Sequence, residues 1–420
     1  MQSRKITISR QQHYRCILCG RCCRRFYVLI SKAEKERIAK FDWGDEPDIP
    51  SDFCQEIHGF LYYRRHPDGG CVFLDDKGVC RMHRRFGFEC KALTCRGYPF
   101  NIVSTFPGEV SVLVRMDCPA VLEDNGPAIT EQRQDIEQLV NELHFGNGFT
   151  ATQLKGMERH AVESLCARLQ EFLDDDSLGM ADCMRAMMHL TNRAESLGGV
   201  FLSDRATMGE VFPSLMQNIR KDLPEMSRYG LGEMSKLLFR QLFSCYCRRD
   251  EEMLCTGIGA RLRQSWNLAR LCLGGGNLSA FGREFPDQPI RQIRLFDRET
   301  NEARASQTIA EQRAIWLTYR RFLSVRLECF QFFGVAYYGT DIFSGLTALF
   351  LTYPLALAFA RIWAASQGRE QIGEADVKHA IGAIDHCHGR SPALKFKTIR
   401  ARERMLAGCY SQLLFALGES

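Results

Sequence analysis

The sequence predicts a mainly α-helical protein, in which a small, irregular, cysteine-rich domain with short strands precedes a large all-helical domain. Ten of the 19 cysteines lie in the first 118 of the 420 residues. Apolar residues recur at helical spacing from about residue 130 onward, and no strand–helix alternation interrupts them. We therefore expect a cysteine-cluster metal-binding domain at 1–120 and a helical domain at 121–420, which has room for two subdomains.

The composition excludes several classes of protein. Hydrophobic residues make up 45% and charged residues 25% of the chain, a globular balance that argues against long disorder. The net charge of +5 is too small for this length to indicate a nucleic-acid partner. Residues Met1 to Arg15 lack the apolar stretch of a secretory signal. We expect a cytoplasmic protein whose reduced thiols bind metal and do not form disulfides.

One apolar segment approaches membrane-spanning length. Ile342 to Ala360 is uncharged for 19 residues, but it contains Pro354 and several hydroxyl side chains, and the sequence offers no second span. The alternative to a membrane span is a buried helix or helix pair, and this is what we expect. The sequence is silent on the oligomeric state.

The N-terminal domain shows few regular elements. Ser31 and Glu34 fit a capping box that begins a helix ending near Gly44. Two β-prone runs within 101–116 flank Pro107-Gly108, which predicts a hairpin. Because such a domain has little core of its own, bound metal would contribute folding free energy.

The region after Pro119 shows helical periodicity. Thr130 is the expected N-cap of a helix with its apolar face at Ile136, Leu139 and Val140. The next apolar stripe runs from Val162 to Leu173. Further helices are expected at about 180–196, 208–223, 231–249, 258–273, 306–333, 342–366 and 374–388.

The first cysteine cluster reads Cys16-Ile-Leu-Cys19-Gly-Arg-Cys22-Cys23. Two-residue gaps allow successive thiolates to fold back onto one zinc ion or iron–sulfur cluster. Adjacent Cys22 and Cys23 cannot easily ligate one ion together as cysteines two residues apart can. They therefore ligate two different centres, or one of them is not a ligand. The flanking arginines favour thiolates. The competing interpretation, buried core cysteines or an oxidised scaffold, is weak for four cysteines in eight residues.

A second group of cysteines has longer gaps, as expected for ligands that come from different loops. For Cys54 and Cys90 we expect a core position without a ligand role. The candidate ligands of this group are Cys71, Cys80, Cys95 and Cys118.

Together these residues resemble a known family. Cys16-x-x-Cys19-x-x-Cys22-Cys23, then Cys71-x-Phe-Leu, Cys80, Cys95-Arg-x-Tyr-Pro-Phe100 and Cys118-Pro119, is similar to the CxxCxxCC family of zinc- or iron-chelating domains. The two-part layout resembles its flagellin lysine-N-methylase branch, which joins the cysteine module to a long helical region. The motif-level resemblance covers about residues 13–120, and beyond them only the layout is similar.

The resemblance implies a bacterial protein lysine N-methyltransferase that uses S-adenosylmethionine, has flagellin as its protein substrate, and holds an iron–sulfur cluster (4Fe–4S) or zinc. Arg96 and Tyr98 also fall on the motif, and they either contact the thiolates from outside the ligand set or pack locally before Pro99. No catalytic residue is implied. The eight motif cysteines suffice for two four-thiolate sites, or for one cluster plus other roles: Cys16, Cys19, Cys22, Cys23, Cys71, Cys80, Cys95 and Cys118.

A non-enzymatic function is the alternative. The chain lacks a strand followed by a glycine-rich turn and a helix, so a cofactor site of the doubly wound kind is not expected. The same thiolates could hold zinc or iron for structure or redox sensing, with the helices docking a partner.

Other chemistry-bearing residues give weaker signals. His386-Cys387-His388 could ligate metal, but a helix-terminal His that interacts with the helix dipole explains it equally well. We expect Cys245, Cys247 and Cys255 to be core or surface residues, and the Met-rich stretch 180–188 to be core.

Overall fold

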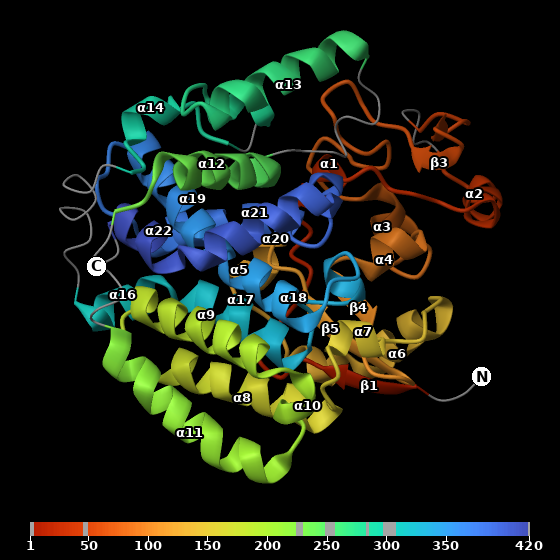
Figure 1. Ribbon diagram of the computed structural model, residues 1–420. Helices are drawn as coiled ribbons and strands as arrows, with labels where there is room; N and C mark the ends of the chain where they lie inside the picture. Colours follow the sequence, from red (N-terminus) through yellow and green to blue (C-terminus); the bar gives the residue numbers. More distant parts are fainter. Residues whose placement is uncertain are drawn as a thin grey trace.

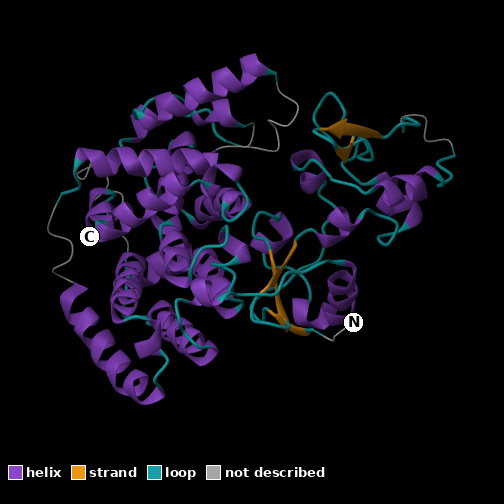
Figure 2. Ribbon diagram, turned by 45° about the vertical axis from the view of Figure 1, so that its right-hand side comes forward, coloured by secondary structure: helices purple, strands orange, loops and turns teal. Residues whose placement is uncertain are grey.

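Helices form most of the molecule, and a smaller irregular lobe lies at one side of them (Figures 1 and 2). The structure is a computed structural model, and it describes residues 4–44, 49–223, 230–247, 257–282, 285–296 and 308–418. The predicted mainly α-helical class, with short strands confined to the N-terminal part, is confirmed.

A three-stranded sheet joins the N-terminus to the motif that ends at Cys118. It contains β1 (Lys5–Ile8), β4 (Phe100–Ser104) and β5 (Glu109–Val114) in the order β1-β5-β4. Strands β4 and β5 are antiparallel, with Phe100 opposite Val114, so the predicted hairpin at Pro107-Gly108 is confirmed. Strand β1, which the sequence analysis did not predict, pairs with β5 in parallel.

The remaining N-terminal elements form the small lobe, which we define as residues 13–44 and 49–97. Its elements are α1 (Arg21–Arg25), α2 (Lys32–Ala39), β2 (Cys54–Ile57), β3 (Phe60–Tyr63), α3 (Arg81–Phe86) and α4 (Leu93–Gly97). The predicted capping box starts α2, because Ser31 Oγ accepts from the Glu34 amide at 3.2 Å. Glu34 also accepts from the Leu93 amide at 2.7 Å, so it ties α2 to α4.

Two hydrophobic cores divide the chain. The small lobe has its own core between Val28 and Ala92, in which Trp43, Phe53 and Tyr63 surround Phe73. The sheet packs instead into the larger core with the helices. The chain therefore enters the larger core at β1, leaves it for the small lobe and returns at β4.

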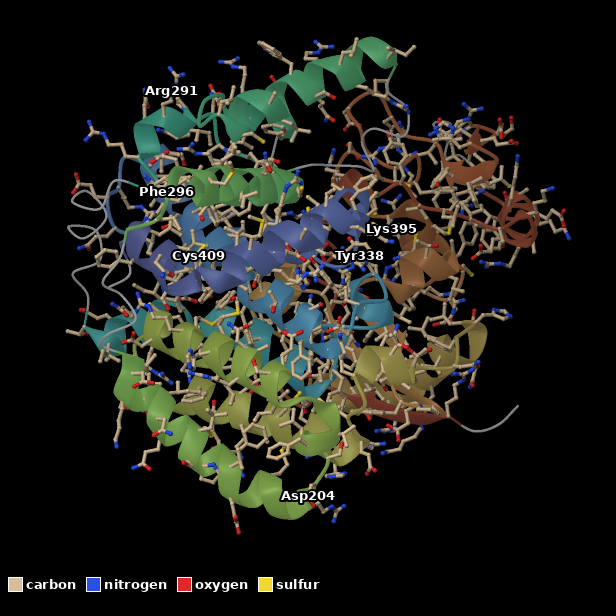
Figure 3. The ribbon with its side chains drawn as sticks, in the orientation of Figure 1. Asp204, Arg291, Phe296, Tyr338, Lys395 and Cys409 are labelled. Carbon is tan, nitrogen blue, oxygen red and sulfur yellow. The ribbon has the colours of Figure 1, made fainter. Side chains whose placement is uncertain are left out.

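The long region after Cys118 is helical, as predicted. Its side chains fill the space between the helices (Figure 3). The α-helices are α5 (Pro119–Leu122), α6 (Arg133–Glu142), α7 (Ala151–Leu154), α8 (Arg159–Asp174), α9 (Met180–Leu197), α10 (Gly199–Leu202), α11 (Arg205–Asp222), α12 (Glu233–Cys247), α13 (Ile258–Cys272), α14 (Ile290–Ile293), α16 (Ile309–Ile315), α17 (Leu317–Glu328), α18 (Ile342–Phe350), α19 (Thr352–Ser366), α20 (Glu374–Cys387), α21 (Lys397–Gly408) and α22 (Tyr410–Ala416). Within the described ranges, four 3-10 turns accompany them: η1 (Ile129–Gln132), η3 (Leu278–Phe281), η4 (Val335–Tyr337) and η5 (Pro392–Lys395).

The apolar segment 342–366 forms the centre of the larger core as two consecutive helices, α18 and α19. It is long and apolar enough to cross a membrane, but 94% of its most apolar window is buried inside the molecule. The expectation of a buried helix pair is confirmed. The Met-rich start of α9 is also core, since Met180, Met184 and Met187 are buried.

One sequence expectation needs correction, and two helices were not predicted from the sequence. Thr130 is not the N-cap of a long helix, because it lies within η1 and α6 begins only at Arg133. Helices α21 and α22 were not predicted at all. Their buried faces are short and separated by Cys409, where the first helix ends (Figure 3).

Glu403 on α21 gives the fold a pH dependence. Its carboxylate is buried and accepts from Tyr337 Oη at 2.6 Å, and burial raises its pKa from 4.5 to about 7. A carboxyl whose folded-state pKa is raised favours the fold while protonated. Its stabilisation is full below pH 4.5 and is lost as the pH rises towards 7, on the order of 3 kcal/mol in all.

We predict that Glu403→Gln removes most of this loss of folding stability with rising pH. The melting temperature of the wild type should fall between about pH 5 and pH 7 relative to that of the variant, as followed by circular dichroism. Glu137→Gln, which alters an exposed carboxylate on α6, is the control and should parallel the wild type. Parallel curves for Glu403→Gln and the wild type would contradict the assignment.

Candidate metal centre

The first cysteine cluster lies on a loop that turns sharply into α1. Leu18 and Gly20 have positive φ angles of 53° and 66°. A Cβ at Gly20 would lie 2.4 Å from the Gly78 carbonyl oxygen, so only glycine allows the loop to lie against the turn that precedes Cys80. Helix α1 then places Cys22 Sγ 3.9 Å from Cys23 Sγ.

The second group comes from four separate elements. The Cys71 amide donates to the Cys23 carbonyl at 2.9 Å, which fixes this loop beside α1. Cys80 caps α3, Cys95 lies on α4, and Cys118 caps α5. The expectation that different loops deliver these thiols agrees with this placement.

The eight predicted cysteines converge on two adjoining cavities. The smaller, of about 50 Å³, is lined by seven of them, namely Cys16, Cys19, Cys22, Cys23, Cys80, Cys95 and Cys118. The larger, of about 490 Å³, is lined by Cys71 and again by Cys22, Cys23, Cys80 and Cys95. Cys54 and Cys90 line neither cavity. Each of the eight predicted cysteines thus lines at least one of the two cavities.

The thiols lie around the two cavities, but the described side chains are not arranged as the ligands of one metal ion. In the ranges that the structure describes, no three His, Cys, Asp or Glu side chains are arranged to hold one metal ion. The 18 cysteines in these ranges are free thiols.

Burial sets the protonation of the sulfur atoms. It raises the pKa of the Cys71 and Cys118 thiols to about 12, and that of the Cys95 thiol further. Cys22 differs, because a hydrogen bond from the Cys23 thiol lowers its pKa to about 7 while the pKa of Cys23 rises. The pKa of Cys22 is therefore lowered, whereas those of Cys23, Cys71, Cys95 and Cys118 are raised.

Lys91 supplies positive charge within the group, and the sequence analysis missed it. Burial disfavours the charge of Lys91, but the Cys95, Cys80 and Cys22 sulfur atoms raise its pKa above the ordinary value. Its side chain lines both cavities, and the Nζ atom lies 5.3 Å from the centre of the Phe88 ring. Nothing in the local sequence distinguishes this lysine from a surface one.

The larger cavity combines an apolar wall with two guanidinium groups. Phe26, Phe100 and Ile102 contribute apolar surface, and Arg115 and Arg390 contribute the charges. Burial lowers the pKa of Arg390 to about 10. These residues also escaped the sequence analysis, because they lie far apart in the chain and carry no local motif.

The two motif residues between Cys95 and Pro99 have different surroundings. Tyr98 lines both cavities, and its hydroxyl donates to Asp117 Oδ1 at 3.2 Å. Arg96 points towards carboxylates, donating to Glu142 Oε1 at 2.9 Å and to Glu89 Oε2 at 3.3 Å. Tyr98 thus borders the thiols, whereas Arg96 joins α4 to α6.

A buried ionic network connects this region with the helical core. Asp117, next to Cys118, accepts from Arg115 Nε at 3.1 Å and lies 3.2 Å from His386 Nδ1. Although burial opposes its charge, Arg115 and His386 hold the pKa of Asp117 well below its usual range.

Asp385 on α20 continues the network. It accepts from the Met116 amide at 2.6 Å and pairs with Arg326 of α17. The C-terminal end of α20, which carries Asp385 and His386, therefore meets the segment that carries Cys118.

The His386-Cys387-His388 tripeptide does not form one site. His386 faces Asp117, Cys387 Sγ contacts the Tyr246 carbonyl at 3.4 Å, and His388 Nδ1 lies 2.9 Å from Tyr246 Oη. Among the other weak candidates, Cys245 and Cys247 lie on α12 within the larger core, and Cys255 lies outside the described residues.

Comparison with known proteins gives little further information. No family model matches the chain. The chain is 24% identical over 134 residues to an uncharacterized protein of Methanocaldococcus jannaschii, a match that covers 31% of this chain and 45% of that protein. The chain thus spans less than half the length of this relative. No solved structure matches.

The ionic network predicts a large stability effect at Asp117. Asp117→Ala leaves the buried Arg115 and the His386 ring without their carboxylate, and should lower the free energy of unfolding by on the order of 3–5 kcal/mol. Tyr98→Phe removes one hydrogen bond and should cost about 1 kcal/mol. Urea unfolding followed by tryptophan fluorescence measures both.

The exposed pair Arg133–Glu137 provides the control. Glu137→Ala should change the free energy of unfolding by less than about 0.5 kcal/mol. An Asp117→Ala variant that unfolds at the same urea concentration as the wild type would show that the network does not hold the two parts together.

Proposed function

We propose that this protein is a metal- or iron–sulfur-dependent protein lysine N-methyltransferase that acts on a flagellin-type substrate with S-adenosylmethionine. The observation that carries the proposal is the convergence of all eight motif cysteines on two adjoining cavities. The free thiols suit a cytoplasmic location, which we propose as well.

The thiols fit a bound metal centre by charge and by ligand chemistry. Lys91 is a partly buried cation among several sulfur atoms, and the high pKa values of Cys71 and Cys118 mean that these two thiols stay protonated without a bound cation. Ionising four of them requires more positive charge, which a Zn²⁺ ion or an iron–sulfur cluster would supply. Such a centre would provide Lewis-acid or electron-transfer chemistry at the wall of the larger cavity.

The larger cavity fits the methyl donor by size and lining. Its volume of about 490 Å³ falls in the range of ligand sites. The aromatic ring of Phe100 can stack on a purine, and the Arg115 or Arg390 guanidinium can donate hydrogen bonds to a carboxylate. A purine and a carboxylate are the groups that S-adenosylmethionine carries at its ends.

A redox-sensing or metal-storing module without methyl transfer is the second candidate. The observation in its favour is the Cys22–Cys23 pair, in which a thiol with a pKa of about 7 stands 3.9 Å from a second sulfur atom. Thiols of low pKa are the ones that oxidise most readily.

Cysteine substitution tests the ligand set. We predict that Cys19→Ser and Cys22→Ser lower the metal and acid-labile sulfide content of anaerobically purified protein, because each removes a thiolate from the cavities. Cys90→Ser and Cys387→Ser are the matched controls, since neither residue lines either of the two thiol-lined cavities, and both should keep the wild-type content. Wild-type content in Cys19→Ser and Cys22→Ser would refute the ligand set.

Transfer of a labelled methyl group tests the activity. Cluster-replete protein incubated with methyl-labelled S-adenosylmethionine and flagellin should place label on flagellin lysines, whereas Cys22→Ser should not and Cys90→Ser should. Brown protein that transfers methyl groups supports the proposal. Metal-replete protein that transfers none would contradict it, and colourless protein with stoichiometric zinc would favour the non-enzymatic candidate.

A further inference from the structure

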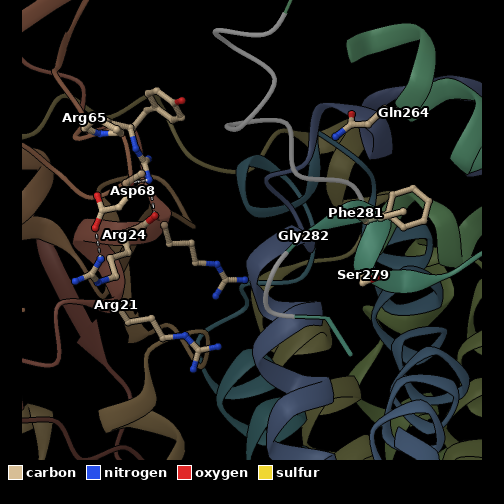
Figure 4. A pocket seen from close by; sticks show the side chains of 13 residues that line it. Arg21, Arg24, Arg65, Asp68, Gln264, Ser279, Phe281 and Gly282 are labelled. Atoms are coloured by element: carbon tan, nitrogen blue, oxygen red, sulfur yellow. Dashed lines mark hydrogen bonds and ion pairs between the residues drawn. The ribbon is translucent and has the colours of Figure 1, made fainter. Parts of the chain in front are cut away.

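A second, positively charged cleft opens where the small lobe faces α13 and η3 (Figure 4). Its volume is about 680 Å³. One wall carries four arginines and one acid, Asp68, and the other carries Gln264, Ser279 and Phe281. Within the ranges that the structure describes, the arginines that line this cleft are Arg21, Arg24, Arg25 and Arg65.

Among the residues that the structure describes, the arginines of the cleft outnumber the acidic partners available to them. Arg24 Nη1 pairs with Asp68 Oδ2 at 2.9 Å, which offsets one charge. Arg65 stacks on the Tyr27 ring at 4.5 Å and holds the Arg24 and Gly69 carbonyls, but its Nη1 atom is buried without a hydrogen-bond partner. Arg25 Nε and Nη1 are likewise buried and unpaired. Buried donors of this kind are costly to leave unsatisfied, so they point to a ligand that accepts hydrogen bonds.

Three of the arginine charges of the cleft lie along one side of α1. Arg21, Arg24 and Arg25 have i, i+3 and i+4 spacing, which places them on one side of α1. Figure 4 shows Arg21 reaching from this wall towards the gap, across from Gln264 and Phe281. A small anion such as phosphate needs donors that converge on one point. Donors spread along one wall, with an amide and an aromatic ring opposite, match an extended peptide that carries several carboxylates.

The cleft adjoins the larger thiol-lined cavity. Helix α1 carries the three arginines of the cleft together with Cys22 and Cys23 of the cavity, and Tyr27 lines both spaces. A peptide bound in the cleft therefore lies one side chain away from the cavity assigned to the methyl donor.

We propose that this arginine cleft binds an acidic segment of the protein substrate, so that the lysine to be modified is one flanked by Asp and Glu residues. The inference rests on the proposed function for the fate of that lysine. Binding of the acidic segment itself requires neither metal nor methyl donor.

Direct binding to the full-length protein tests the inference. The probe is a short fluorescein-labelled peptide with one Lys among Asp and Glu residues, and the matched peptide has Asn and Gln in their place. Fluorescence anisotropy should show binding of the acidic peptide that weakens with added salt, and about tenfold weaker binding of the neutral one. Equal affinity for the two peptides would overturn the inference.

Arginine substitutions locate the binding. Arg21→Gln/Arg25→Gln should weaken acidic-peptide binding about tenfold, because it removes two charged donors from the wall. Arg133→Gln/Arg193→Gln, which removes the same charge from exposed positions on α6 and α9, should bind like the wild type. Equal affinity of the Arg21/Arg25 variant and the wild type would overturn the inference, as would binding of inorganic phosphate or single-stranded RNA without binding of the acidic peptide.

The two proposals fail in different ways. Acidic-peptide binding without methyl transfer would contradict the proposed function and leave the arginine cleft standing. Methyl transfer to an acidic substrate that is undiminished in Arg21→Gln/Arg25→Gln would leave the function standing and remove the cleft from it.

Discussion

The buried carboxylates of Asp117 and Asp385 hold the sulfur-bearing segments against the helical core, and the rest of the site depends on this contact. Asp117 contacts Arg115, Tyr98 and His386 through its carboxylate oxygens. Asp385 accepts from the Met116 amide and pairs with Arg326. Ionic groups buried this deeply are stable only when they are paired. The network therefore fixes how β5 and the Cys118 turn meet α17 and α20, and with them one wall of the thiol-lined cavities.

The thiols, unlike the paired carboxylates, are buried without enough positive charge around them to ionise together. Packing five or more sulfur atoms around small cavities is easy while they are neutral, and burial keeps Cys71, Cys95 and Cys118 neutral by raising their pKa. Ionising them together requires compensating charge, of which Lys91 provides one unit within the described residues. A cation at this place would shift several thiol equilibria at once, and its binding would then be coupled to the order of the small lobe.

Much of this was predictable from sequence because it depends on local patterns. The capping box at Ser31, the hairpin around Pro107-Gly108 and the apolar stripe of α8 each follow from spacing within one segment. The eight cysteines were found because close spacing of thiols is rare by chance. Thr130 was misassigned because the chain already enters a 3-10 turn at Ile129, and α-helical geometry begins only at Arg133.

The remaining features depend on segments distant in the chain. Lys91, Arg115 and Arg390 become site residues only when α4, β5 and the turn after α20 meet. The arginine cleft likewise needs α1 to face η3, across more than half of the sequence. No periodicity or motif within one segment predicts that distant segments will contact each other. These site residues were therefore recognised only from their burial and from the cavities that they line.

The most direct test of the central claim, that the eight converging thiols form a metal centre, is X-ray absorption spectroscopy at the iron and zinc edges on anaerobically purified full-length protein. The account predicts a metal whose protein ligands are sulfur atoms at about 2.3 Å, lost in Cys22→Ser and kept in Cys90→Ser. Protein that binds no stoichiometric metal, or a metal coordinated mainly by nitrogen and oxygen, would contradict it.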